Sequence, residues 1–157
     1  MLWGRGVHNG VQGFIVRRVR HRDAAAPVNH GGGHEKGLDI AWAAFADGWR
    51  AKYQPAMKRV RDGETGWIKL DDLHRGNLVE LLAEFSISGL SEVEIDHWNK
   101  AWHRLNPWPD TVAGLTRLKT KFVLATLSNG NVALLVNMAK NGGLPWDAVL
   151  GRRSPDI

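Results

Sequence analysis

Apolar side chains begin to recur at helical spacing near Leu38. The positions that share one face are Trp42, Phe45, Trp49, Tyr53, Met57 and Val60. Pro55 lies within this stretch, and proline removes a backbone N–H and crowds the preceding helical turn. We therefore predict an amphipathic helix that Pro55 bends or interrupts.

Two further helical patterns follow a loop at residues 62–66. Asp71 or Asp72 can cap the first of them, and its apolar positions are Leu73, Leu78, Leu81, Leu82 and Phe85. Ser91 and Glu94 have the spacing of a capping box that opens the second, whose inward positions are Ile95, Trp98, Trp102 and Leu105. The pattern thus predicts an all-helical block over residues 38–106 with Trp-rich apolar faces.

The pattern changes at Pro107-Trp-Pro-Asp110, which ends the third helix. A fourth helix follows, with inward positions Val112, Leu115 and Leu118. Residues 122–127 then form an apolar run typical of a buried parallel strand, a helical pattern begins near residue 132, and residues 148–150 form a short strand. Residues 107–157 are therefore predicted to be a partial α/β core.

The turn after the predicted strand contains Ser128, Asn129, Gly130 and Asn131. Ligands of open α/β sheets bind at the carboxyl ends of parallel strands, where backbone N–H groups and a helix N-terminus converge. Ser128, Asn129 and Asn131 are therefore expected to face a cleft, with Gly130 permitting a sharp turn. The alternative is an ordinary strand-to-helix turn in which Ser and Asn only cap the helix.

The composition fits one domain, or a small domain with an insertion: 157 residues, 43% hydrophobic, with eight tryptophans. The absence of cysteine excludes disulfides and thiolate metal sites, and makes the reducing cytoplasm the expected compartment. No apolar run approaches the length of a membrane span, and no secretory signal pattern is present. We expect no membrane association.

The excess positive charge lies mainly in residues 1–37, which hold six Lys/Arg against two Asp/Glu and eight of the 18 glycines. A disordered basic arm could contact nucleic acid through residues 1–22, and His21, His30 and His34 are a weak candidate metal site because no carboxylate or thiolate completes the set. We favour a third interpretation, a segment without evolved structure apart from residues 13–16, which argues against nucleic acid as a partner.

Four stretches together resemble the haloacid dehalogenase superfamily, specifically the type II (S)-2-haloacid dehalogenases. They are Trp49-Arg-Ala-Lys-Tyr53, Trp102-His-Arg-Leu-Asn-Pro-Trp-Pro-Asp110, Leu127-Ser-Asn-Gly130 and Leu144-Pro-Trp-Asp-Ala-Val-Leu-Gly151. The resemblance covers roughly residues 35–150. It implies a Rossmann-like core with a helical cap between the first strand and the Ser-Asn-Gly strand.

The resemblance also implies roles for individual residues. Arg50 matches the cap arginine that receives the halide and attracts the anionic substrate, Ser128 matches the residue that holds carboxylates, and Asn129 lies beside it in the pocket. It implies no metal and no cofactor, a small-molecule haloacid as substrate, and leaves a homodimer open. Without the resemblance, Arg50 would be taken for a surface arginine.

The remaining basic side chains of the cap and core suggest no chemistry. Lys100, Lys119 and Lys121 are expected on solvated faces. His74, His97 and His103 are expected on the cap surface or hydrogen-bonded in the core.

The sequence departs from the family at both ends. The family nucleophile is an aspartate in an Asp-x-x-Gly-Thr motif, whereas Asp23 is followed by Ala-Ala-Ala-Pro. Ser154 precedes Pro-Asp where the family has a catalytic lysine, and a serine cannot supply that cation. The later acidic motif of the family is also missing. The chain as written is therefore expected to be catalytically impaired.

Reading-frame shifts would account for both departures. Residues 16–23 can be encoded as GTT CGA CGT GTT CGG CAC CGT GAC, which one base later reads Phe-Asp-Val-Phe-Gly-Thr-Val. Residues 151–156 can be encoded as GGG CGC CGA AGC CCG GAC, which one base later reads Gly-Ala-Glu-Ala-Arg. These synonymous codons are permitted by the protein sequence and not proved by it. Our hypothesis is that both ends are out-of-frame translation of a dehalogenase gene.

The function implied by the resemblance is hydrolysis of a short (S)-2-haloacid to the (R)-2-hydroxyacid through an aspartyl ester. Two alternatives remain. One is another hydrolase of the superfamily, such as a phosphatase, which would need Mg²⁺ held by acidic residues. The other is a non-catalytic fragment that binds a partner through its Trp-rich helices.

Overall fold

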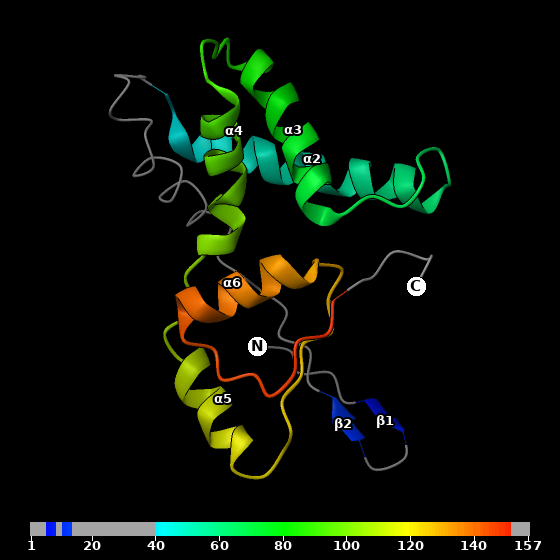
Figure 1. Cartoon of the computed structure of the whole chain (residues 1–157), viewed down its shortest axis with the longest axis vertical. Helices are drawn as coiled ribbons and strands as arrows, with labels where there is room; N and C mark the ends of the chain where they lie inside the picture. Colours follow the sequence, from blue (N-terminus) through cyan, green and yellow to red (C-terminus); the bar gives the residue numbers. More distant parts are fainter. Residues whose placement is uncertain (1–5, 9–10, 14–39, 152–157) are drawn as a thin grey trace.

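The computed structural model describes residues 6–8, 11–13 and 40–151 (Figure 1). Three helices, α2 (Trp42–Arg61), α3 (Leu70–Glu84) and α4 (Glu92–Asn99), pack together, and the 3-10 helix η3 (Lys100–Arg104) continues from α4. Helices α5 (Thr111–Lys119) and α6 (Val132–Gly142) lie below these helices in the view of Figure 1. The predicted helical block and the two later helices are thus confirmed.

The larger of the two hydrophobic clusters among the described residues joins the helical block to α6. Its buried members are Phe45, Trp49, Leu78, Leu81, Leu82, Trp98, Ala101, Trp102, Leu105 and Leu134. The aromatic rings meet edge to face, for example Trp49 and Trp102 at 5.0 Å between centroids, which is the arrangement that ring quadrupoles favour. Trp49 also donates a hydrogen bond from Nε1 to the carbonyl of His74, at 3.0 Å, so its polar atom is satisfied in the core.

Of the two expected effects of Pro55, the interruption of α2 is wrong, and the bend stays a prediction. The helix runs from Trp42 to Arg61 with Pro55 inside it. Residues on both sides of the proline are buried, including Trp49 and Met57. Burying a large apolar side chain contributes about 1.5–3 kcal/mol, and a proline in a helix costs about 3 kcal/mol, so burial on both sides is sufficient to keep the helix continuous.

The predicted N-terminal caps of α3 and α4 have different outcomes. The capping box of α4 is confirmed, because Ser91 Oγ accepts from the Glu94 N–H and the Glu94 carboxylate accepts from the Ser91 N–H. The expected cap of α3 is wrong. Lys69 is the N-cap residue, and Asp71 and Asp72 lie in the first helical turn. Asp71 instead hydrogen-bonds outside its own helix.

The expected strand at residues 122–127 is present only as two isolated parallel bridges, Ala125 with Ala148 and Ser128 with Gly151. The parallel direction is as predicted, but side chains replace part of the ladder. The Thr126 hydroxyl accepts from the Leu150 N–H at 2.9 Å and donates to the Leu150 carbonyl at 3.0 Å. The Leu124 N–H donates to the Asp147 carboxylate at 2.8 Å. These bonds hold the segments together without forming a regular sheet.

A short hairpin lies near the N-terminus, where the sequence predicted almost no structure. Strand β1 (Gly6–His8) pairs antiparallel with β2 (Val11–Gly13). The apolar stretch expected at residues 14–16, the candidate metal ligands His21, His30 and His34, and Asp23 and Ser154 all lie outside the described residues.

Candidate functional site

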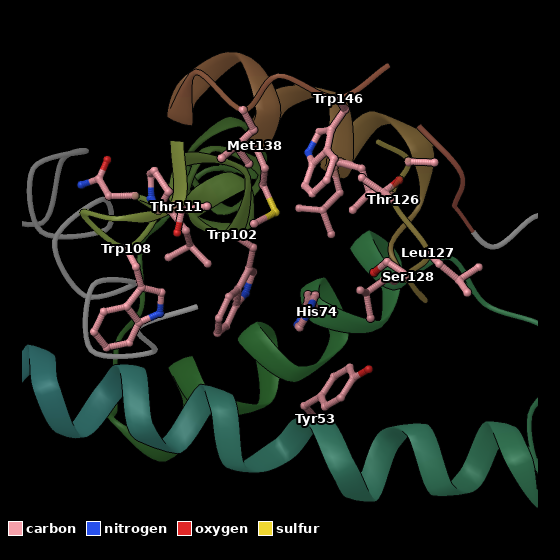
Figure 2. Close-up of a pocket in the computed structure, with 18 of the residues that line it drawn as sticks. Tyr53, His74, Trp102, Trp108, Thr111, Thr126, Leu127, Ser128, Met138 and Trp146 are labelled. Carbon is pink, nitrogen blue, oxygen red and sulfur yellow. The ribbon is translucent and has the colours of Figure 1, made fainter. Parts of the chain in front are cut away.

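A cavity of about 370 Å³ lies between the helical block and the segment that leads into α6. On the helical side it is lined by residues of α2, α3 and η3, and on the other side by residues 125–128 and by α6. Figure 2 shows Tyr53, His74 and Trp102 facing the segment that carries Ser128. The aromatic lining residues are Tyr53, Trp102, Trp108 and Trp146. The size and the mainly apolar wall suit a small organic ligand.

Arg50 and Ser128, which the resemblance assigned to one site, both line this cavity. Arg50 is half-buried on α2, and its guanidinium lies over the ring of Tyr53, 4.8 Å from Cζ to the ring centroid. This places a permanent positive charge at an apolar wall, where it attracts anions more strongly than in bulk water. Arg50 is thus only partly exposed, and its role at this cavity stays a prediction.

Ser128 and Gly130 form a compact turn in front of α6. Ser128 Oγ accepts from the Gly130 N–H at 3.0 Å. Gly130 does not adopt a positive φ, so the backbone conformation of the turn does not itself require a glycine. A side chain at this position would be crowded, because a Cβ at Gly130 would approach the Leu135 side chain to 3.2 Å and the Leu134 side chain to 3.3 Å. The turn therefore packs directly against the first turn of α6, whose N-terminal N–H groups attract negative charge.

Asn129 and Asn131 do not lie in the cavity with Ser128, contrary to the expectation that all three face one cleft. They line a separate, much smaller recess together with Met57 and Trp67. Asn131 is the N-cap residue of α6, but its side chain makes no capping hydrogen bond. Instead, its Nδ2 donates to Asp71 Oδ2 at 2.9 Å. The simple capping interpretation of this turn is therefore wrong for Asn131.

His74 lines the cavity, whereas the sequence placed it on the cap surface or hydrogen-bonded in the core. Its side chain is 6% exposed and its Nδ1 has no hydrogen-bond partner. The ring stacks on Trp102, 4.8 Å between centroids, and on Tyr53 at 5.8 Å. Burial lowers the pKa of His74 to about 4, and the nearby positive charge of Arg50 acts in the same direction while Asp71 opposes it. The imidazole is thus neutral at pH 7.

The helical periodicity of α3 could have identified His74. It lies one turn after Leu70 and one turn before Leu78, on the face that is buried in the core. A histidine on such a face is expected to be buried. What periodicity could not show is that the same face also borders a cavity.

His103 fits the expectation of a hydrogen-bonded core histidine. It is 5% exposed, and its ring nitrogens contact Asp71 Oδ1 at 3.0 Å and Asn137 Nδ2 at 2.9 Å. Burial opposes ionisation of Asp71, but the hydrogen bonds from His103 and Asn131 outweigh it and hold the pKa of Asp71 below its usual value. His97 is exposed on α4.

The lysines lie on solvated faces as expected. Lys100 pairs with Asp96 at 2.6 Å and Lys119 with Asp147 at 2.7 Å, and all four side chains are at least one-third exposed. Within the part of the chain that the structure describes, no group of three His, Asp or Glu side chains could hold a metal ion. No helix among the described residues is both long enough and apolar enough to cross a membrane.

Solved structures with a similar fold include L-2-haloacid dehalogenases. The chain is similar to the defluorinating L-2-haloacid dehalogenase Rha0230, with a TM-score of 0.81 and 41% identity over 88% of this chain and 59% of that one. It is similar to the L-2-haloacid dehalogenase PA0810, with a TM-score of 0.75 and 41% identity over 88% and 61%. The enzyme from Xanthobacter autotrophicus shares the fold, with a TM-score of 0.69 at 22% identity over 85% and 51%.

The chain therefore has the haloacid dehalogenase fold with a helical cap, and spans about three-fifths of the first two relatives. At 41% identity it is similar in sequence and structure to type II haloacid dehalogenases, members of the haloacid dehalogenase superfamily. No family model and no curated protein matches the sequence.

Proposed function

We propose that the chain binds short (S)-2-haloacids in the cavity between the cap and the Ser128 turn. The observation that carries this proposal is that Arg50 and Ser128, from segments far apart in sequence, line the same mainly apolar cavity. A haloacid has an anionic end and an apolar carbon–halogen end. The guanidinium and the hydroxyl suit the first, and the tryptophan and leucine side chains of the wall suit the second.

The reaction proposed for a complete family member is a two-step displacement. An aspartate oxygen forms a bond to C2 while the carbon–halogen bond breaks, and the halide leaves with the bonding electrons. Water then hydrolyses the ester, which releases the (R)-2-hydroxyacid and restores the carboxylate. Covalent catalysis of this kind depends on its nucleophile. In this chain Arg50 would attract the substrate carboxylate and receive the leaving halide, and Ser128 would hold the carboxylate.

The chain as written is proposed to bind without appreciable turnover. The sequence contains no Asp-x-x-Gly-Thr motif, and Ser154 stands where the family has its lysine. Loss of a nucleophile costs orders of magnitude in rate. We further propose that residues 107–157 belong to a Rossmann-like core, supported by the two parallel bridges, and that the protein is cytoplasmic, supported by the absence of cysteine.

The alternative of a docking module that uses its tryptophans is less well supported. Among the seven tryptophans in the described part of the chain, three are buried and four are half-buried, so none presents an exposed ring. The phosphatase-like alternative requires a Mg²⁺ site. The apolar wall around Arg50 suits a haloalkanoate better than a phosphate ester, which carries more charge.

Titration with (S)-2-chloropropionate tests the proposal, with tryptophan fluorescence as the readout because Trp102, Trp108 and Trp146 line the cavity. We expect a saturable change that is weaker for the (R) enantiomer, and chloride release no faster than in a control without protein. Absence of saturable binding would overturn the proposed ligand. Chloride release above the control would overturn the proposed lack of turnover.

A further inference from the structure

Asp71 joins the helical cap to the start of α6 through both oxygens of its carboxylate. Oδ1 contacts Nε2 of His103 on η3 at 3.0 Å, and Oδ2 accepts from Nδ2 of Asn131 at 2.9 Å. The backbone carbonyl of Asp71 also accepts from Asn99 Nδ2 at 3.0 Å. One residue of α3 is therefore fixed by three partners, and each of its side-chain oxygens has a separate one.

The tautomer of His103 follows from its second contact. Nδ1 of His103 faces the amide nitrogen of Asn137, which can only donate. Nδ1 therefore accepts, and the ring proton lies on Nε2, where it donates to Asp71. Asn137 belongs to α6, so the network reaches α6 twice, at its N-cap residue and within the helix.

Asn131 immediately follows the turn that carries Ser128. Its donor group is directed to Asp71 in place of its own helix. The turn itself is closed by the bond from the Gly130 N–H to Ser128 Oγ. The position of Ser128 relative to the cap, and hence to Arg50, is thus constrained from the cap side by a charge-assisted hydrogen bond, which is stronger than a neutral one.

We propose that Asp71 is a positioning residue that holds the Ser128 turn in register with the cap across the ligand cavity. Asp71 does not line the cavity, so it acts through Asn131 and through the His103–Asn137 pair. The part of the proposal that concerns ligand affinity rests on the proposed function. The part that concerns the position of the turn does not.

An exchange of the two side chains tests the proposal. Asn131→Asp alone places two carboxylates against each other. Asp71→Asn combined with Asn131→Asp restores the pair with its polarity reversed, because the new amide donates to residue 131 and its oxygen still accepts from His103. Asp72→Asn combined with Asn131→Asp is the matched control, since Asp72 is exposed in the same helical turn and the net charge is identical.

Two measurements are made on each full-length variant: amide hydrogen exchange by residue, and affinity for (S)-2-chloropropionate. In Asn131→Asp we expect faster exchange confined to residues 128–135 and about tenfold weaker binding, as for loss of one hydrogen bond to a charged group. The Asp71/Asn131 exchange should restore both, and the Asp72 control should restore neither. If Asn131→Asp does not fold, Asn131→Ala should give the same local exchange pattern.

Equal rescue by the Asp72 control would overturn the proposal, since it would show only general charge repulsion. Faster exchange in every helix alike would overturn it too, because that is the result of lost global stability. If the unaltered protein does not bind the haloacid, the proposed function fails, while the exchange pattern still decides the role of Asp71.

Discussion

The guanidinium of Arg50 lies over the ring of Tyr53, with Cζ 4.8 Å from the ring centroid. The contact orients the charged group at the cavity wall before any ligand arrives. A planar guanidinium can stack on a ring and donate two parallel hydrogen bonds to a carboxylate, whereas a lysine ammonium cannot. The contact with Tyr53 therefore fixes the orientation of the same group that carries the positive charge.

Arg50→Lys should weaken binding of (S)-2-chloropropionate by about tenfold or more although the charge is kept, because the bidentate hydrogen-bonding geometry is lost. Tyr53→Leu should weaken it by a few-fold, since a cation–π contact that is not fully desolvated contributes about 0.5–1 kcal/mol. Arg59→Lys, an exposed change on the same helix, is the control and should leave affinity unaltered. Equal affinities for the Arg50 and Arg59 variants, measured by fluorescence titration, would contradict the assignment.

His74 should make the stability of the protein depend on pH between about 6.5 and 4. Its pKa is lowered to about 4 in the folded state by burial, so the unfolded chain binds more protons in this range. The contribution of His74 to the free energy of unfolding is then fully present above the unfolded pKa of about 6.5. It is lost as the pH decreases toward 4, by up to about 3 kcal/mol. Asp71 and Asp147 titrate below this range because their pKa values are lowered from 3.8.

Urea unfolding at pH 7.5 and pH 5.0 measures the effect. His74→Phe, which keeps an aromatic ring for Trp102 but cannot be protonated, should lose most of the difference between the two pH values. His97→Phe serves as the comparison. Burial lowers the pKa of His97 as well, but this residue is exposed on α4, so most of the difference should remain. An unchanged pH dependence in His74→Phe would show that another group is responsible.

Thr126 should be important for the core because its hydroxyl both donates to and accepts from the backbone of Leu150. Thr126→Val keeps the shape but leaves the Leu150 N–H and carbonyl without these partners, so we expect a loss of about 1–3 kcal/mol in the free energy of unfolding. Thr126→Ser should lose much less. Thr120→Val is the control, since Thr120 makes a single exposed bond to Arg117. A chemical denaturation series in which both valine variants behave alike would rule out this role.

Local patterns predicted the helices well, and side-chain interactions between distant segments explain most of the failures. The spacing of Phe45 and Trp49 and the Ser91–Glu94 capping box are local features, and the structure contains both. The continuity of α2 through Pro55 depends on packing against α3, which no local rule includes. Asp71 could be recognised as a cap candidate, but not as a partner of a residue 60 positions away.

The residues of the candidate site also differ in how far the sequence could predict their positions. The resemblance brought Arg50 and Ser128 together, and the structure places both at one cavity. Asn129 follows Ser128 directly, but adjacent residues in a turn point in different directions, and it lies in another recess. The sequence did not place His74 at the cavity, because a histidine on an apolar helix face suggests packing alone.

The nucleotide sequence of the gene decides whether both ends are out of frame, and with them the nucleophile and the lysine on which activity depends. If both ends are out-of-frame, the bases that encode residues 16–23 must read Asp-x-x-Gly-Thr when shifted by one position, and those after residue 151 must continue the family pattern. Any codon choice that prevents the first motif contradicts the hypothesis. Where the codons permit it, a gene with both shifts repaired should release chloride from (S)-2-chloropropionate. The same repair with the motif aspartate changed to asparagine should not, because the amide cannot supply the carboxylate oxygen that displaces halide.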